Sequence, residues 1–120
     1  MKDLKDSKLF TPYQMGPVTL RNRTIRSAAF ESMGKDFGPT QALKDYHVSV
    51  ARGGVGMTTL AYASVNRSGV SFNSQLWLRD EIIPQLRDIT DAVHNEGAAV
   101  GIQIGHCGNM THWSTAGCFP

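Results

Sequence analysis

The 120-residue sequence has few of the features that define several large protein classes. Its two cysteines are too few for a disulfide scaffold. Its 12 basic and 10 acidic residues leave no charge excess that would favour nucleic acid or an anionic membrane. The longest apolar runs span a few residues, far fewer than the roughly 20 that cross a bilayer, and none follows the charged residues 1–8. These absences predict a soluble, cytoplasmic protein without a signal peptide.

Short motifs of well-known active sites are also missing. There is no P-loop, no His-Glu-x-x-His zinc motif and no Gly-x-Ser-x-Gly nucleophile elbow. The glycines of residues 53–56 precede a predicted strand, whereas a dinucleotide-binding loop follows one. The spacing of His106, Cys107, His112 and Cys118 lacks the paired Cys-x-x-Cys form of structural zinc sites. We expect no metal site there, but a loose loop with unrelated cysteines and histidines.

The sequence does contain enough apolar residues for a core, 41% of the total, and 12 glycines that indicate many tight turns. A small hairpin is predicted over residues 10–21, because Gly16 and Pro17 punctuate two short extended runs. A long loop is predicted over residues 66–79. Nearly uncharged stretches predict three strands, over residues 24–30, 55–62 and 98–104.

Two helices are predicted between these strands, each from a capping residue to a glycine. Thr40 is the expected N-cap of the first helix, and Gly53 its stop. Asp80 is the expected N-cap of the second, which has Pro84 in its first turn and stops at Gly97. The order strand, helix, strand, helix, strand predicts an α/β fold with a parallel sheet and right-handed crossovers.

Ligands of parallel α/β folds bind beyond the carboxyl ends of the strands, which directs attention to Gln103. Gln103 lies in an apolar strand near its carboxyl end. Its amide offers a donor pair and an acceptor on one rigid group, and so matches the edge of a pyrimidine-like ring. The competing interpretation is a core glutamine that bonds to neighbouring backbone.

Other residues at the strand ends also have two interpretations. Ala28 and Ala29 are small enough for a flat ring to approach the backbone, or they simply pack against the hairpin. Tyr62 either lines a pocket or is a buried aromatic with a satisfied hydroxyl. The carboxylates Glu31 and Asp36 are expected to cap helices or face solvent.

Several segments together resemble Old Yellow Enzyme-type NADH:flavin oxidoreductases, of the 2-enoate and 2,4-dienoyl-CoA reductase-like kind. Residues 103–108 are similar to the family's Gln-Leu-x-His-x-Gly-Arg motif, with Asn109 in place of the arginine. Further similar segments occur in order along nearly the whole chain, at residues 9–12, 16–23, 26–33, 51–57 and 86–94.

The resemblance implies part of a TIM (β/α)₈ barrel that binds FMN at the carboxyl ends of its strands. It implies reduction of activated alkenes, such as enones or enoyl thioesters, with NADH or NADPH as reductant. By resemblance, Gln103 bonds the pyrimidine edge of the flavin and Tyr62 faces its ring. Ser27, Ala28, Ala29 and Phe30 would lie along the flavin after the first strand. Phe30 stands where many members carry Thr or Cys, whose side chain can bond the flavin carbonyl.

A complete barrel of this kind needs about 250 residues, so we expect residues 1–120 to form a single partial domain. It would comprise an arm (1–9), a barrel-floor hairpin (10–22) and the first three βα units (23–120). We expect no catalytic residue in it and no activity of the segment alone. The alternative is a stand-alone flavin-binding or assembly module that completes its barrel by self-association through an open sheet edge.

Overall fold

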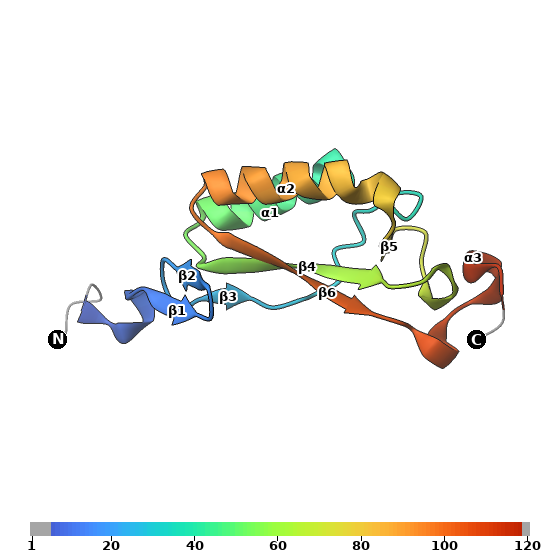
Figure 1. Ribbon diagram of the computed structural model, residues 1–120, viewed down its shortest axis with the longest axis horizontal. Helices are drawn as coiled ribbons and strands as arrows, with labels where there is room; N and C mark the ends of the chain where they lie inside the picture. Colours follow the sequence, from blue (N-terminus) through green and yellow to red (C-terminus); the bar gives the residue numbers. More distant parts are fainter. Residues whose placement is uncertain (1–5, 119–120) are drawn as a thin grey trace.

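The computed structural model describes residues 6–118 as one layer of helices on a sheet. Two helices, α1 (Gln41–Arg52) and α2 (Ile83–Asn95), lie side by side over the long strands β4 (Met57–Ser64) and β6 (Ala99–Gly105) (Figure 1). The predicted α/β alternation is confirmed. No helix in this described part of the chain has the length and apolar character that spanning a membrane requires.

The sheet is parallel, as predicted, and β4 is its centre. Along one edge, β4 pairs with β6 for most of its length. Along the other edge it pairs with two short strands, β3 (Ile25–Arg26) and later β5 (Leu76–Trp77). The predicted loop over residues 66–79 therefore contains a strand. Two residues are too few to give a periodic pattern that sequence inspection could detect.

The predicted first strand, over residues 24–30, is wrong in its length. Only Ile25 and Arg26 pair with β4, and residues 27–34 are neither helix nor strand. The physical reason is that side chains replace the missing ladder. Arg26 Nη1 donates to the carbonyl of Thr59 at 2.7 Å, and the amide of Ala61 donates to the Glu31 carboxylate at 3.2 Å.

The predicted start is right for one helix and wrong for the other. The hydroxyl oxygen of Thr40 accepts from the Leu43 amide at 3.3 Å, so Thr40 caps α1 as expected. Asp80 is not the cap of α2. It begins a 3₁₀ turn, η4 (Asp80–Ile82), and α2 follows without any side-chain cap. The 3₁₀ turn satisfies the first backbone groups locally, and Pro84 in the first turn needs no partner for its nitrogen.

The two predicted glycine joints are present at the end of the sheet where the strands begin. Gly54 has φ +102° after α1, and Gly97 has φ +78° after α2, conformations that favour glycine. The predicted hairpin is also confirmed, as the antiparallel pair β1 (Tyr13–Met15) and β2 (Val18–Leu20). Residues 1–5 of the predicted arm lie outside the described residues.

Arg21, just after the hairpin, ties these elements together. Its Nε donates to the Val55 carbonyl at 3.0 Å and its Nη1 to the Glu96 carbonyl at 2.8 Å, while Nη2 donates to Ala51. One guanidinium thus satisfies carbonyls at the ends of both helices, where a positive charge is also favoured by the helix dipoles.

The core lies between the helices and the sheet. Its buried members come from α1, α2 and the strands beneath them, and are Leu43, Ala51, Leu60, Ala63, Leu76, Ile89, Val93 and Ala98. The opposite face of the sheet carries no helix among the described residues (Figure 1). The remaining short elements are η2 (Lys8–Phe10), η3 (Arg67–Gly69), η5 (Gly108–Met110) and α3 (Trp113–Ala116).

Candidate functional site

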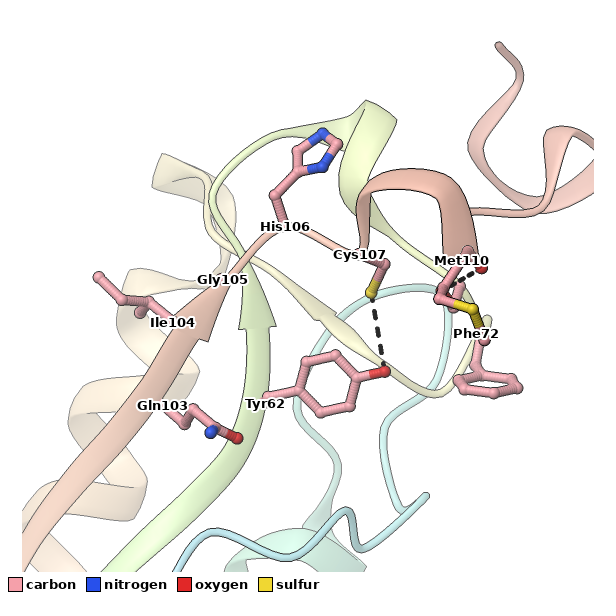
Figure 2. A pocket seen from close by; sticks show the side chains of 9 residues that line it. Tyr62, Phe72, Gln103, Ile104, Gly105, His106, Cys107 and Met110 are labelled. Carbon is pink, nitrogen blue, oxygen red and sulfur yellow. Dashed lines mark hydrogen bonds between the residues drawn. The ribbon is translucent and has the colours of Figure 1, made fainter. Parts of the chain in front are cut away.

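A cavity of about 480 Å³ opens at the carboxyl ends of β4 and β6 (Figure 2). This is where ligands bind in parallel α/β folds, and the volume lies within the roughly 300–1,000 Å³ typical of small-molecule sites. Side chains from β4, β6 and the loops that follow them line it. They are Tyr62, Ser71, Phe72, Gln103, Ile104, Gly105, His106, Cys107 and Met110.

Gln103 lies at this cavity with its polar group free. Its side chain is exposed, and none of the hydrogen bonds among residues 6–118 involves its amide. Figure 2 shows the side chain extending from β6 on the side where Tyr62 lies on β4. An unbonded primary amide beside an aromatic wall can accept and donate to a ligand edge at no cost in protein hydrogen bonds.

Tyr62 offers the cavity a neutral hydroxyl. Its oxygen lies 3.8 Å from the Cys107 sulfur (Figure 2). Burial, together with the contact to Cys107, raises the pKa of Tyr62 to about 12, so the hydroxyl remains protonated at neutral pH. Cys107 also accepts from Nε2 of the buried Gln75 at 3.7 Å. The loose loop predicted for Cys107 is therefore wrong: its thiol is held between Tyr62 and Gln75.

Phe30 extends the aromatic wall beyond the cavity. Its ring centroid lies 5.2 Å from that of Tyr62, edge to face, and 5.4 Å from that of Phe72, stacked. Ser27, Ala28 and Ala29 precede it on the same irregular segment and lie outside the cavity lining. Of the six predicted site residues, the structure thus brings three together and places the other three on the adjoining segment.

A buried polar cluster, which we call the Glu31 cluster, underlies that segment. It consists of Arg26, Glu31, His47 and Thr58. Arg26 Nη1 lies 2.9 Å from Glu31 Oε1, and His47 Nε2 lies 3.0 Å from the same oxygen. His47 Nδ1 bonds the Thr58 hydroxyl at 2.8 Å. The side chain of Glu31 is only 2% exposed and that of His47 is fully buried.

The expectation that Glu31 faces solvent or caps a helix is therefore wrong. Burial by itself would raise the pKa of Glu31, but the contact with His47 and backbone hydrogen bonds, including one from Ala61, lower it on balance. The carboxylate thus keeps its charge at neutral pH. One sequence signal could have indicated the cluster: His47 follows Leu43 by four residues, on the buried face of α1.

The cysteines and histidines near the end of the described chain do not gather. Within residues 6–118, no three His, Cys, Asp or Glu side chains lie close enough to hold a metal ion. Cys107 lies in the cavity, whereas Cys118 is exposed elsewhere.

Comparison with known proteins shows the family. A model of the NADH:flavin oxidoreductase / NADH oxidase family matches residues 8–115. The chain belongs to this family. The resemblance predicted from the sequence is thereby confirmed.

Individual relatives show how much of a family member is present. A 4,4'-dithiodibutanoate disulfide reductase of Rhodococcus erythropolis is 43% identical over 100 residues, which are 83% of this chain and 25% of that protein. An NADPH dehydrogenase of Listeria welshimeri is 37% identical over 106 residues, 85% of this chain and 31% of that protein. The chain therefore spans about a quarter to a third of the length of these relatives.

A solved structure shows the fold. The old yellow enzyme homologue from Zymomonas mobilis superposes with a TM-score of 0.85 at 23% identity, over 95% of this chain and 32% of that one. The sheet and helices are thus part of a TIM barrel, as predicted. The cavity opens at the carboxyl ends of the strands of this partial barrel.

Proposed function

We propose that this family member forms part of the FMN site of an NAD(P)H-dependent flavin oxidoreductase. The observation that carries the proposal is the unbonded Gln103 amide at a cavity bounded by Tyr62, at the carboxyl ends of two parallel strands. The residues present suit a flavin: a flat ring with a polar pyrimidine edge needs an apolar wall and a donor–acceptor group at one side.

Each predicted site residue has a role in this proposal. Gln103 binds the pyrimidine edge, and Tyr62 faces the ring with a protonated hydroxyl. Phe30 supplies an apolar flank, since its side chain has no group that could bond a flavin carbonyl. Ser27, Ala28 and Ala29 present small side chains and backbone along the ring. Bound FMN would supply the redox chemistry that carries hydride from NADH or NADPH to substrate.

We further propose an activated alkene, such as an enone or enoyl thioester, as the substrate class. The family resemblance supports this class. The names of the two relatives, a disulfide reductase and an NADPH dehydrogenase, support a reductive reaction more than any one substrate.

The 120 residues alone are proposed to be inactive, as a single partial domain whose hairpin closes a barrel floor. Their parallel sheet consists of β3, β4 and β6, together with the two-residue strand β5. None of the residues that line the cavity is proposed to act as a catalytic acid. The purified chain should therefore show no enone-dependent consumption of NADH in the presence of FMN. A rate comparable to that of a full-length relative would overturn this part of the proposal.

Flavin binding is tested by titrating FMN with the chain and following flavin fluorescence. Gln103→Ala should weaken binding about tenfold or more, since it removes a paired donor and acceptor. Gln85→Ala is the matched control, because Gln85 is an exposed glutamine on α2, away from the cavity. Equal affinity of both variants and the wild type would contradict the assigned role of Gln103.

One observation favours the alternative of a stand-alone flavin-binding or assembly module. β6 pairs only with β4, so its other edge carries no strand among the described residues, and Ile104 on it is 59% exposed. Size-exclusion chromatography with flavin absorbance distinguishes the two proposals. A discrete yellow oligomer favours the module, whereas material without a discrete oligomer favours the partial domain.

A further inference from the structure

The edge of β4 that faces β3 and β5 has a gap in its hydrogen-bond ladder. β3 pairs with Met57 and Thr58, and β5 pairs with Ala63 and Ser64. Between these pairs, β4 has no strand partner on this edge within residues 6–118. The register with β6 on the other edge also shifts between Leu60 and Ala63. The backbone that carries Tyr62 therefore receives little support from neighbouring strands.

Two charged side chains fill this gap. The Thr59 carbonyl accepts from Arg26 Nη1 at 2.7 Å, and the Ala61 amide donates to Glu31 Oε2 at 3.2 Å. Met57 also donates toward this edge, to the Thr24 carbonyl at 3.2 Å. Residues 57, 59 and 61 alternate along the strand, so the side chains continue the ladder where backbone pairing stops.

The same pair also holds the segment that crosses the gap. Arg26 Nη2 donates to the Ala29 carbonyl at 3.0 Å, and Arg26 Nη1 bonds Glu31 Oε1 at 2.9 Å. Arg26 Nε donates to the Tyr46 hydroxyl at 3.2 Å, and its guanidinium lies over the Tyr46 ring. Both walls of the proposed flavin site, residues 27–30 and Tyr62, are thus connected through one carboxylate and one guanidinium.

Neither Glu31 nor Arg26 lines the cavity, so any effect on a ligand is exerted through the backbone that they hold. A carboxylate suits the position because both oxygens accept hydrogen bonds, Oε1 from Arg26 Nη1 and Oε2 from the Ala61 amide. An amide in the same place would direct an NH₂ group at a donor and leave a buried group unpaired.

We propose that Glu31 is a positioning residue, which preforms the two walls of the flavin site by replacing the β3 ladder along β4. This inference rests on the proposed function as far as the ligand is concerned. It adds a residue outside the cavity that sets the spacing between the Ala29–Phe30 backbone and Tyr62 before any ligand binds.

The experiment compares the wild-type chain with Glu31→Gln and with Glu96→Gln as the matched control. Glu96 also pairs with an arginine, Arg52, at 2.6 Å, but near the opposite end of the sheet and with its side chain 29% exposed. Two quantities are measured for each variant: hydrogen exchange of backbone amides in the chain without ligand, and the dissociation constant for FMN from fluorescence titration.

Glu31→Gln should speed exchange of the Ala61 amide about tenfold or more, because that amide loses its charged acceptor. The amide of Ala99, which donates to the Gly56 carbonyl at 2.9 Å, should keep its protection. FMN binding should weaken about tenfold, by loss of preorganisation. Glu96→Gln should change neither quantity.

Faster exchange at Ala61 with unchanged FMN affinity would overturn the inference, because Glu31 would then support only the fold. Unchanged exchange at Ala61 would overturn it as well. If the wild-type chain binds no FMN, the proposed function fails, and local exchange at Ala61 alone then decides whether Glu31 positions this strand.

If Glu31→Gln fails to fold, Glu31→Asp decides. It keeps the negative charge beside Arg26 but shortens the side chain that reaches the Ala61 amide. Faster exchange at Ala61 together with several-fold weaker FMN binding supports the inference. Unchanged exchange at Ala61 or unchanged FMN affinity overturns it.

Discussion

The two ends of the sheet differ in how their backbone polar groups are hydrogen-bonded. At the amino end, loops and helix termini meet at Arg21, which donates to the carbonyls of Ala51, Val55 and Glu96. At the carboxyl end, the central strand is completed by side chains of the Glu31 cluster and opens onto a cavity with a free amide, Gln103. The first end satisfies its own polar groups, whereas the second leaves one available for a ligand.

Under the proposed function, stability and ligand binding are assigned to opposite ends of the sheet. Carbonyls bonded at the amino end fix the chain but offer nothing to a ligand. At the carboxyl end, buried charges hold a surface whose aromatic and amide groups remain accessible. Barrels of this type carry stability at one end and chemistry at the other.

The largest expected loss of stability comes from a substitution at the amino end of the sheet. Arg21→Ala removes three hydrogen bonds to carbonyls from a charged donor, and should lower the free energy of unfolding by about 3 kcal/mol. Urea unfolding followed by circular dichroism measures it. Arg87→Ala, at an exposed position on α2, is the control and should cost less than about 0.5 kcal/mol. Similar losses for both variants would contradict the role assigned to Arg21.

A pair of glycine substitutions compares the rigidity of the two ends. A Cβ at Gly56 would lie 2.5 Å from the Asn22 carbonyl oxygen, whereas at Gly69 it would meet the His106 ring and the Ser64 hydroxyl, also at 2.5 Å. Backbone cannot move aside as the exposed His106 ring can. Gly56→Ala should therefore cost about 2–3 kcal/mol and Gly69→Ala about 1 kcal/mol. Thermal unfolding of the two variants checks the order, and a reversed order would refute it.

The sequence predicted some parts of the fold and not others, and the two groups differ in the range of the contacts that form them. The hairpin, α1, the glycine joints and the parallel order are local patterns, and all were predictable from spacing and turn residues. The short β3, the two-residue β5 and the Glu31 cluster were not. Each depends on contacts between segments far apart in the chain, such as Glu31 with Ala61, for which no periodic signal exists.

Some residues of the candidate site were predictable from the sequence and others were not. Gln103 and Tyr62 were predictable because they lie near the carboxyl ends of two strands, and these ends must meet in a parallel sheet. The position of Cys107 was not, because the loop after β6 is fixed by contacts to Gln75 and Tyr62. Phe72 joins the site only through the course of a loop that has no regular spacing.

A smaller effect, dependent on pH, tests the charge at the carboxyl end. The folded pKa of Glu31 lies below its ordinary value of 4.5. Its contribution to stability is therefore complete above about pH 4.5 and is lost as the pH falls through the folded pKa. Glu31→Gln should flatten this part of the curve of unfolding free energy against pH. A slope equal to that of the wild type would show that Glu31 carries no such linkage.

The smallest expected effect concerns Gln103. Because its amide is exposed and unbonded, Gln103→Ala should change the free energy of unfolding by less than about 0.5 kcal/mol. Chemical denaturation measures this change. A loss above about 1 kcal/mol would assign Gln103 to the support of the fold, like Arg21 at the other end.

The most direct test of the division between the two ends is a map of backbone amide shifts on addition of FMN to the ¹⁵N-labelled chain. The account predicts that the perturbed amides gather at the carboxyl end, in residues 27–30, Tyr62 and residues 103–107. The amides around Arg21, Gly56 and Gly97 should remain unchanged. Shifts centred on the hairpin end, or no shifts at all, would contradict it.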